Sequence, residues 1–276
     1  MDTGGEAAAI ERTAAAGKLP PTPASLEADL RALDIGDGDV IMVHSSLSKL
    51  GWIPAGATSV VQALLAAVGP TGTVCMPTHS GQLTDPAKWG DPPVPEEWFD
   101  IIRSERPVYD PATSPTRGMG QIVEAFRTYP GSKRSAHPIL SLAANGAAAD
   151  QIVENHPLTE ALGETSPLAR LYELDAKVLL LGVDHGNDTS MHLAEYRAEW
   201  GDKPMVTEAV SVIVDGSRRW VEYSDVDHDE SDFAQIGEAF AGTGRELSGP
   251  VGLGVGRVAR QRDLVDFAVT WIEANR

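Results

Sequence analysis

The segment NDTSMHLAEYRAEW, residues 187–200, places a histidine and a carboxylate, His192 and Glu195, three residues apart. Residues at positions i and i+3 share one face of a helix, so the carboxylate can reach the imidazole ring. A carboxylate beside an imidazole fixes its tautomer and raises its basicity, which is what a general base requires. Surface pairs with this spacing also stabilise ordinary helices by a few tenths of a kcal/mol. The pair alone therefore leaves catalysis and helix stabilisation open.

The elements that must position this pair are strands that end in polar residues. The apolar run AKVLLLGV, residues 176–183, predicts a buried strand, and a helix is predicted to carry the His–Glu pair. Ser45 and Ser46 follow a second predicted strand, and Thr78 follows a third. Ligands of open α/β sheets bind outside the carboxyl ends of strands, near helix N-termini. We therefore expect these polar residues to gather at one edge of a sheet.

The order of the predicted elements indicates the fold class. Residues 25–80 follow the order helix, strand, helix, strand, which is typical of a parallel sheet with crossover helices. Asp215-Gly216, between two β-branched runs, predicts a hairpin turn. The prediction is an α/β fold with a central, mostly parallel sheet flanked by helices and an added antiparallel hairpin region.

The domain organisation follows from composition along the chain. Residues 1–24 are predicted to be a flexible N-terminal tail that ends in a cluster of prolines, and residues 25–276 a single α/β domain. Within that domain, residues 81–115 are rich in Pro, Asp and Trp and are predicted to form a long irregular loop. Loops of this length inside a compact domain are usually functional or mobile.

Charge and cysteine content bound the function further. Asp and Glu outnumber Lys and Arg by 40 to 22, a net charge of −18, which repels nucleic acid and anionic membranes and attracts polycations. Solubility alone is the other interpretation of this charge. The single cysteine, Cys75, makes disulfides within the chain impossible and fits a cytoplasmic setting. Neither a signal peptide nor a membrane-spanning run is evident.

Several residue types in the chain are those of metal and phosphate sites. The chain has seven histidines, yet it contains no HExxH motif, no paired cysteines and no two histidines at ligand spacing on one helix, so no metal site is predicted. Lys133, Arg134 and Ser135 form one of the few basic clusters and can hold a phosphate, with Ser45 and Ser46 adding donors. A solvated turn is the alternative. Together these clusters suggest a phosphate-bearing cosubstrate and a cationic substrate.

Six stretches of the chain, in the same order throughout, resemble the aminoglycoside 3-N-acetyltransferases, antibiotic-resistance enzymes that use acetyl-coenzyme A (acetyl-CoA). These stretches are VHSSLSKLG, LLAAVGPTGTVCMPTHSG, YDPATSPTRGMGQIVEAFRTYPGSKRSAHPILSLAANG, SPLARLYELDAKVLLLGV, TSMHLAEYRA and GPVGLGVGRVARQRDLVDFAV. The resemblance covers roughly Ser25 to Ala274. Six linked motifs are far more specific than any one of them.

The resemblance implies roles for residues of this chain. His192 would be the general base that deprotonates the attacking amine, and Glu195 its orienting carboxylate or a ligand of a substrate ammonium group. Coenzyme A would be held by Ser45, Ser46, Leu47, Thr78, Lys133, Arg134 and Ser135. The aminoglycoside would be bound by Asp85, Asp225 and Asp227.

The implied activity is direct transfer of an acetyl group from acetyl-CoA to the 3-amino group of an aminoglycoside, with no metal. One rival is a metal-dependent amide hydrolase that uses Asp184, His192 and His228. A second rival is a non-catalytic drug-binding protein, and a third is an acetyltransferase that acts on an amine other than an antibiotic.

Overall fold

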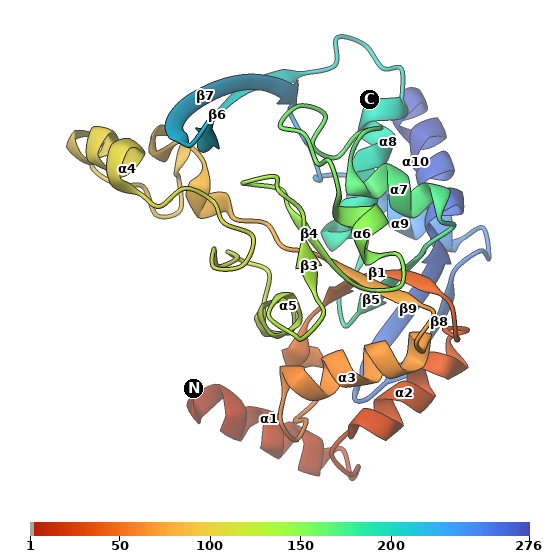
Figure 1. Cartoon of the computed structure of the whole chain (residues 1–276). Coiled ribbons are helices and arrows are strands. Elements are labelled where there is room, and N and C mark those ends of the chain that lie inside the picture. Colours follow the sequence, from red (N-terminus) through yellow and green to blue (C-terminus); the bar gives the residue numbers. More distant parts are fainter. Residues whose placement is uncertain (1–2) are drawn as a thin grey trace.

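The computed structural model describes residues 3–276. A seven-stranded sheet lies at its centre, with the strand order β3-β4-β2-β1-β5-β9-β8, and β6 and β7 form a separate two-stranded sheet (Figure 1). The strands are β1 (Val40–Ser45), β2 (Thr73–Pro77), β3 (Lys133–Arg134), β4 (Leu142–Gly146), β5 (Lys177–Leu181), β6 (Met205–Val214), β7 (Ser217–Val226), β8 (Leu247–Val251) and β9 (Gly254–Arg260).

Ten α-helices and six short 3-10 turns, counted within residues 3–276, connect these strands. The helices are α1 (Thr3–Ala15), α2 (Pro23–Ala32), α3 (Ala57–Val68), α4 (Phe99–Glu105), α5 (Gln121–Arg127), α6 (Ala149–Val153), α7 (Pro167–Glu173), α8 (His192–Arg197), α9 (Phe233–Ala241) and α10 (Gln261–Asn275). The 3-10 turns are η1 (Leu47–Lys49), η2 (Gly81–Leu83), η3 (Pro86–Lys88), η4 (Glu96–Trp98), η5 (His185–Asn187) and η6 (Thr189–Met191).

Strand β1 is the centre of the sheet and runs parallel to both of its neighbours, β2 and β5. The outer pairings, β3–β4, β2–β4, β5–β9 and β8–β9, are antiparallel, so β4 and β9 run against the other five strands. The predicted α/β fold with a central, mostly parallel sheet and an added hairpin is therefore confirmed. Four of the six pairings are nevertheless antiparallel, because each reversed strand contributes two of them.

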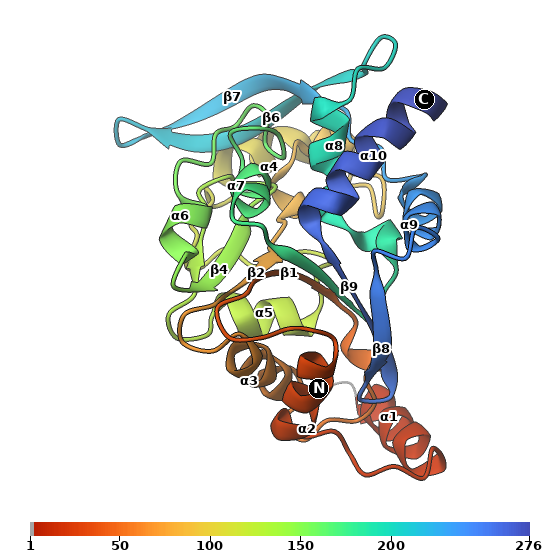
Figure 2. The same cartoon turned by 90° about the vertical axis from the view of Figure 1, so that its right-hand side faces the viewer.

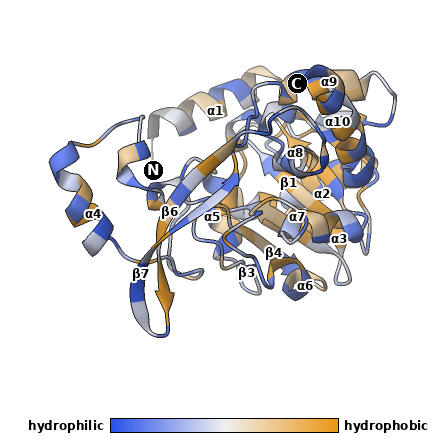
Figure 3. Cartoon of the chain, turned by 90° about the horizontal axis from the view of Figure 1, so that it is seen from above, coloured by the Kyte–Doolittle hydropathy of each residue, from blue (hydrophilic) through white to orange (hydrophobic). Residues whose placement is uncertain are grey.

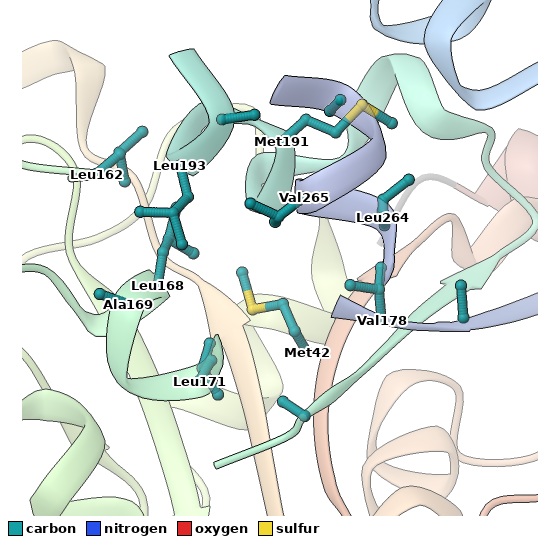
Figure 4. Packing of buried hydrophobic residues seen from close by; sticks show 14 of the residues in the cluster. Met42, Leu162, Leu168, Ala169, Leu171, Val178, Met191, Leu193, Leu264 and Val265 are labelled. Atoms are coloured by element: carbon teal, nitrogen blue, oxygen red, sulfur yellow. The ribbon is translucent and has the colours of Figure 1, made fainter. Parts of the chain in front are cut away.

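Alternation along the strands divides the core into two layers, because successive side chains of a strand point to opposite faces of the sheet. Ile41 and Val43 pack with helices α2, α3 and α5. Met42 packs on the other face with α6 to α10. Figure 4 shows Met191 and Leu193 directed into this second layer. These two fully buried residues flank His192 and fix the start of α8.

The hairpin forms as its turn residues predict. Asp215 has φ of 50° and Gly216 has φ of 73°, which suits the left-handed two-residue turns that match strand twist. The hairpin lies on the same side of the sheet as α8 (Figure 2) and extends from the main body beside α4 (Figure 3). Arg218 of β7 donates hydrogen bonds to the carbonyl groups of Arg103 and Arg106 at the end of α4. The hairpin and the 81–115 segment therefore support each other.

The predicted long loop, residues 81–115, is irregular only in part, because it contains η2, η3, η4 and α4. Within the predicted flexible N-terminal tail, residues 1–24, residues 3–15 form α1, and residues 1–2 lie outside the described part. The alanine-rich sequence favours a helix. The backbone N–H of Trp52 donates to the buried hydroxyl group of Thr13 at 2.8 Å, which docks α1 on the domain. A single domain over residues 25–276 stays a prediction.

Throughout residues 3–276, no helix has the length and apolar character needed to cross a membrane.

Candidate active site

The carboxyl ends of the parallel strands β1, β2 and β5 lie at one edge of the sheet. Ser45 of β1 is in register with Leu181 of β5. Met42 of β1 is in register with Cys75 of β2, where the pairing of these two strands ends, and Thr78 directly follows β2. From β5 the chain passes through η5 and η6 into α8, and the carboxylate of Asp188 caps η6 by accepting from the backbone N–H of Ser190 at 3.0 Å. His192 therefore opens α8 at this edge.

His192 and Glu195 form the pair that their spacing predicts. Nδ1 of His192 lies 2.6 Å from Oε2 of Glu195. The imidazole side chain is 13% exposed, whereas the carboxylate is fully buried. Because a carboxylate only accepts hydrogen bonds, Nδ1 carries the proton of this bond and Nε2 of the neutral ring has a free lone pair. The arrangement orients a base toward solvent-accessible space.

The carboxylate of Glu195 is held from two further directions. Its Oε1 accepts hydrogen bonds from Nη1 of Arg276 at 2.6 Å and from the backbone N–H of Asp229 at 3.0 Å. Burial raises the pKa of Glu195, but the hydrogen bonds from His192, Arg276 and Asp229 outweigh burial and hold the pKa below its ordinary value. Glu195 is therefore ionised and fixed in orientation, as expected of the orienting partner of a base.

Two aromatic rings pack against His192. The ring centroids of His228 and Phe233 lie 4.9 Å and 4.8 Å from that of His192. The hydroxyl group of Tyr196 lies 2.8 Å from both Asp225 and Nε2 of His228. Since Tyr196 donates to the carboxylate, its oxygen accepts from Nε2–H of His228. Burial lowers the pKa of His228 to about 4, so this ring stays neutral beside the base.

Two further histidines near this edge of the sheet, His79 and His185, are also largely buried. Burial lowers the pKa of His79, which follows Thr78, to about 3, and Nε2 of His79 has no hydrogen-bond partner within the described residues. His185 differs, because Asp188 and Glu246 contact its two ring nitrogens at 3.2 Å and 2.6 Å. Burial lowers the pKa of His185, but these two carboxylates raise it to about 9. His185 is therefore a buried imidazolium between two carboxylates.

The predicted coenzyme A seat on β1 is at the same edge. Oγ of Ser45 is buried and has no hydrogen-bond partner in residues 3–276. Oγ of Ser46 lies 3.2 Å from Oγ of Ser48, and Leu47 begins η1. Thr78 is fully buried, and its hydroxyl group is engaged with the carbonyl group of Ser141 at 3.0 Å. Ser45, Ser46 and Thr78 thus lie at or after the carboxyl ends of neighbouring parallel strands, and of the three only Ser45 has a hydroxyl group without a partner in the described residues.

The basic cluster is divided between surface and interior. Lys133 is half-exposed and pairs with Asp150. Arg134 is buried, and its guanidinium group donates to the backbone or side-chain oxygens of Thr78, Ser80, Ser114 and Ser141.

Ser135 is buried as well. Its hydroxyl group lies 2.8 Å from Nδ1 of His156 and accepts from the backbone N–H of Leu142. Arg134 and Ser135 therefore join β3 and β4 to the end of β2, and their polar groups face partners within the chain.

The three predicted substrate acids have different surroundings. Asp85 pairs with the guanidinium group of Arg103 at 2.8 Å and caps η3. Asp225 is buried, and besides Tyr196 it accepts from the backbone N–H of Ala161 at 2.9 Å. Asp227 is exposed, and no side chain of the described chain pairs with it. Only Asp227 has a carboxylate available to an ammonium group in this arrangement.

The metal-hydrolase alternative finds no assembled ligand set. Asp184 accepts from the backbone N–H of Gly186 at 3.1 Å as the cap of η5. Within residues 3–276, no three His, Cys, Asp or Glu side chains form a group that could hold a metal ion.

Three neighbours of the pair escaped the sequence-based prediction of the site: Arg276, Tyr196 and His228 as a ring partner. Tyr196 directly follows Glu195, so its proximity could have been inferred from the helix. Arg276 lies 81 residues from Glu195, and no local signal connects them.

The chain is similar to known proteins over most of its length. The family model for aminoglycoside 3-N-acetyltransferase matches residues 42–273. The prophage-derived aminoglycoside N(3')-acetyltransferase-like protein YokD of Bacillus subtilis (strain 168) is 45% identical over 258 residues, which cover 93% of this chain and 94% of the relative. Aminoglycoside N(3)-acetyltransferase VII of Streptomyces paromomycinus is 37% identical, with 92% of each chain covered.

Solved structures agree with the sequence relatives. The crystal structure of YokD from Bacillus subtilis superposes with a TM-score of 0.91 at 44% identity and covers 94% of this chain and 95% of that chain. A binary structure of AAC-IIIb with CoASH gives 0.83 at 33% identity, covering 93% and 97%. AAC-VIa bound to sisomicin gives 0.84 at 32% identity, covering 94% and 99%. The chain therefore belongs to the aminoglycoside 3-N-acetyltransferase family and is an acyltransferase.

Proposed function

We propose that this enzyme transfers the acetyl group of acetyl-CoA to the 3-amino group of an aminoglycoside, with His192 as the general base. The observation that carries the proposal is the 2.6 Å contact between Nδ1 of His192 and the buried carboxylate of Glu195. This contact leaves Nε2 of the ring as the proton acceptor. Family membership supplies the reaction, and the geometry of this pair supplies the base.

The proposed chemistry is a direct displacement at the thioester. Nε2 of His192 removes a proton from the substrate amine while the amine nitrogen attacks the carbonyl carbon of acetyl-CoA. The tetrahedral oxyanion that forms then collapses, the carbon–sulfur bond breaks, and the coenzyme A thiolate leaves and takes up a proton from the imidazolium. Alignment of the amine with the thioester and donors aimed at the oxyanion supply much of the rate.

The proposed coenzyme A site lies at the end of β1. The unpartnered hydroxyl group of Ser45, the hydroxyl group of Ser46 and the backbone of Leu47 would hold the cosubstrate there. A relative with 33% identity, AAC-IIIb, is a binary complex with CoASH, which supports a coenzyme A site in this fold. Thr78, Arg134 and Ser135 would shape the wall of the site, and Lys133, at the surface, would contribute charge.

The proposed aminoglycoside site adjoins His192 and draws on acidic residues of the chain. An exposed carboxylate, Asp227, would pair with an ammonium group of the drug, whereas Asp85 would have to exchange Arg103 for the substrate. AAC-VIa, a relative with 32% identity, is bound to sisomicin, an aminoglycoside. The net charge of −18 would concentrate such polycations near the enzyme. Acetylation removes one positive charge from the drug, which would confer resistance.

The decisive experiment is release of free thiol from acetyl-CoA across a panel of aminoglycosides and simple diamines. We expect turnover with aminoglycosides and, for His192→Ala, a fall in kcat of about 100- to 10,000-fold with coenzyme A binding retained. Wild-type turnover in His192→Ala would remove the histidine from the base role. Drug binding without thiol release would identify a binding protein, and turnover with simple amines alone would identify another substrate.

Cys75 as the single cysteine fits the cytoplasm, which we propose as the location.

A further inference from the structure

We propose that Arg276 is a positioning residue for the base: its guanidinium group fixes the carboxylate that orients His192. The inference rests on the proposed role of the His192–Glu195 pair. It concerns a residue that the sequence does not single out, because Arg276 follows α10 and lies 81 residues from Glu195.

The guanidinium group of Arg276 contacts acceptors on two sides. Nη1 lies 2.6 Å from Oε1 of Glu195. Nε and Nη2 form a two-pronged contact with the carboxylate of Asp232 at 2.8 Å and 2.6 Å, and Nη2 also donates to the carbonyl group of Asp229 at 2.7 Å. The planar fork of an arginine suits such a contact. Here Asp232 and the carbonyl group of Asp229 fix the orientation of the guanidinium group, which then donates to Glu195.

The surroundings of Arg276 are as restrictive as its hydrogen bonds. Its side chain is only 9% exposed, and the carbon of its guanidinium group lies 5.0 Å from the centroid of the Trp200 ring. The guanidinium is thus held between an aromatic ring, a carboxylate and a carbonyl group, with one edge directed at Glu195. Because the guanidinium group of Arg276 is fixed in this way, we expect it to fix the orientation of the Glu195 carboxylate.

As a consequence, the two carboxylate oxygens of Glu195 contact different partners. Oε1 is occupied by Arg276 and by the backbone N–H of Asp229, so only Oε2 is directed at His192. The permanent charge of Arg276 also balances a carboxylate that is fully buried. Without Arg276, Glu195 can rotate away from Nδ1, and the ring loses the contact that directs Nε2 at the substrate.

Replacement of Arg276 by Gln tests this inference in the full-length protein. We expect kcat for acetyl transfer to fall by about 10- to 100-fold, the range typical when the partner of an orienting group is removed, with little change in KM for acetyl-CoA. Arg276→Lys keeps the charge but not the fork, and it should regain part of the loss. Added guanidinium ion should partly restore turnover in Arg276→Ala.

Arg262 offers a matched control on the same helix. Its guanidinium group donates to the carbonyl groups of Tyr172 at 2.6 Å and Glu173 at 2.7 Å, so it also anchors α10, but to α7. Arg262→Gln should leave kcat within about twofold of the wild-type value, because it contacts no part of the base. Equal losses of kcat in Arg276→Gln and Arg262→Gln would mean that docking of the helix alone is responsible and would overturn the inference.

A double-mutant cycle with Glu195→Gln separates this inference from the proposed function. If Arg276 acts through Glu195, then adding Arg276→Gln to Glu195→Gln lowers kcat no further. Independent, multiplying losses would contradict the inference. Failure of the base assignment has a different signature, namely wild-type turnover in His192→Ala and in Glu195→Gln. Thermal melting of each variant verifies that the loss of kcat is measured on folded protein.

Discussion

The hydroxyl group of Tyr196 lies 2.8 Å from Oδ1 of Asp225 and 2.8 Å from Nε2 of His228. A tyrosine of α8 thereby joins the end of β7 to the ring that packs on His192. The same carboxylate accepts from the backbone N–H of Ala161, so Asp225 connects three segments of the chain. These contacts favour a structural role for Asp225, whereas Asp227 is exposed.

Replacement of Asp225 by Ala should lower stability, whereas replacement of Asp227 by Ala should weaken substrate binding. Asp225→Ala leaves the hydroxyl group of Tyr196 and the amide of Ala161 without a buried acceptor, and we expect it to lower the free energy of unfolding by about 2–4 kcal/mol. Asp227→Ala should leave that energy within about 0.5 kcal/mol and raise KM for the aminoglycoside. Urea unfolding and steady-state kinetics measure the two effects. Unchanged stability in Asp225→Ala together with a raised KM would return Asp225 to the substrate site.

We expect the main role of Arg134 to be stabilisation of the fold and not binding of a phosphate group. Arg134→Met removes donors from buried oxygens of Thr78, Ser80 and Ser114 at once, so we expect a loss of at least about 3 kcal/mol in the free energy of unfolding. The neighbouring Lys133 is exposed, and Lys133→Met should change that energy by less than about 1 kcal/mol. Calorimetric titration with coenzyme A completes the comparison. A stable Arg134→Met variant with weakened coenzyme A binding would contradict the structural assignment.

The buried neutral histidines predict sensitivity to acid. Burial lowers the pKa of His79 and His156 to about 3 and of His137 and His228 to about 4, against an unfolded value of about 6.5. The unfolded chain therefore binds more protons, so stability is intact above pH 6.5 and is lost as the pH falls toward 4. Urea midpoints between pH 7 and pH 4.5 should fall steadily. A constant midpoint over this range would show that the histidines are protonated in the folded protein.

His185 predicts the opposite dependence on the alkaline side. Its pKa is raised to about 9 in the fold, so the stability it contributes is fully present below pH 6.5 and is lost as the pH rises toward 9. The full effect is roughly 3 kcal/mol, because one pKa unit corresponds to about 1.4 kcal/mol. The matched variant is His185→Gln, whose stability should be lower at pH 6.5 but nearly constant up to pH 9. An equal decline in both proteins would assign the effect to other groups.

Salt should affect the KM values of the two substrates differently. Screening weakens the attraction between a chain of net charge −18 and a polycationic aminoglycoside, so KM for the drug should rise severalfold between about 0.05 and 0.5 M NaCl. Acetyl-CoA is an anion and is repelled by the same charge, so its KM should fall or stay constant. Kinetics with each substrate varied in turn provide the measurement. Parallel changes in the two KM values would point to a conformational effect of salt.

Features with local causes were predictable from the sequence. The hairpin follows from Asp215-Gly216, whose positive φ angles only a few residue types adopt readily. The His192–Glu195 contact follows from helical spacing, and the parallel pairing of β1 with β2 follows from the order helix, strand, helix, strand. In each case the cause lies within a few residues or in a general rule of strand connection.

Features that depend on packing between distant segments were not predictable. The sequence shows Lys133, Arg134 and Ser135 as one basic cluster, but the pairing of β3 with β4 buries the last two. The contact of α1 with Trp52 cannot be read from the composition of residues 3–15. The role of Arg276 is not predictable either, because nothing in the sequence indicates that α10 ends beside α8.

Because of the contact between Glu195 and Arg276, catalytic activity also depends on whether the end of α10 stays folded. Helix ends open more easily than the core unfolds, and the contacts of Arg276 with Asp232 and Trp200 are what hold this end in place. Each opening at the end of α10 would release the carboxylate behind His192 while the sheet remains intact. We therefore expect activity to decline on heating before the molecule melts, so that the working temperature of the enzyme is set by the last turn of one helix.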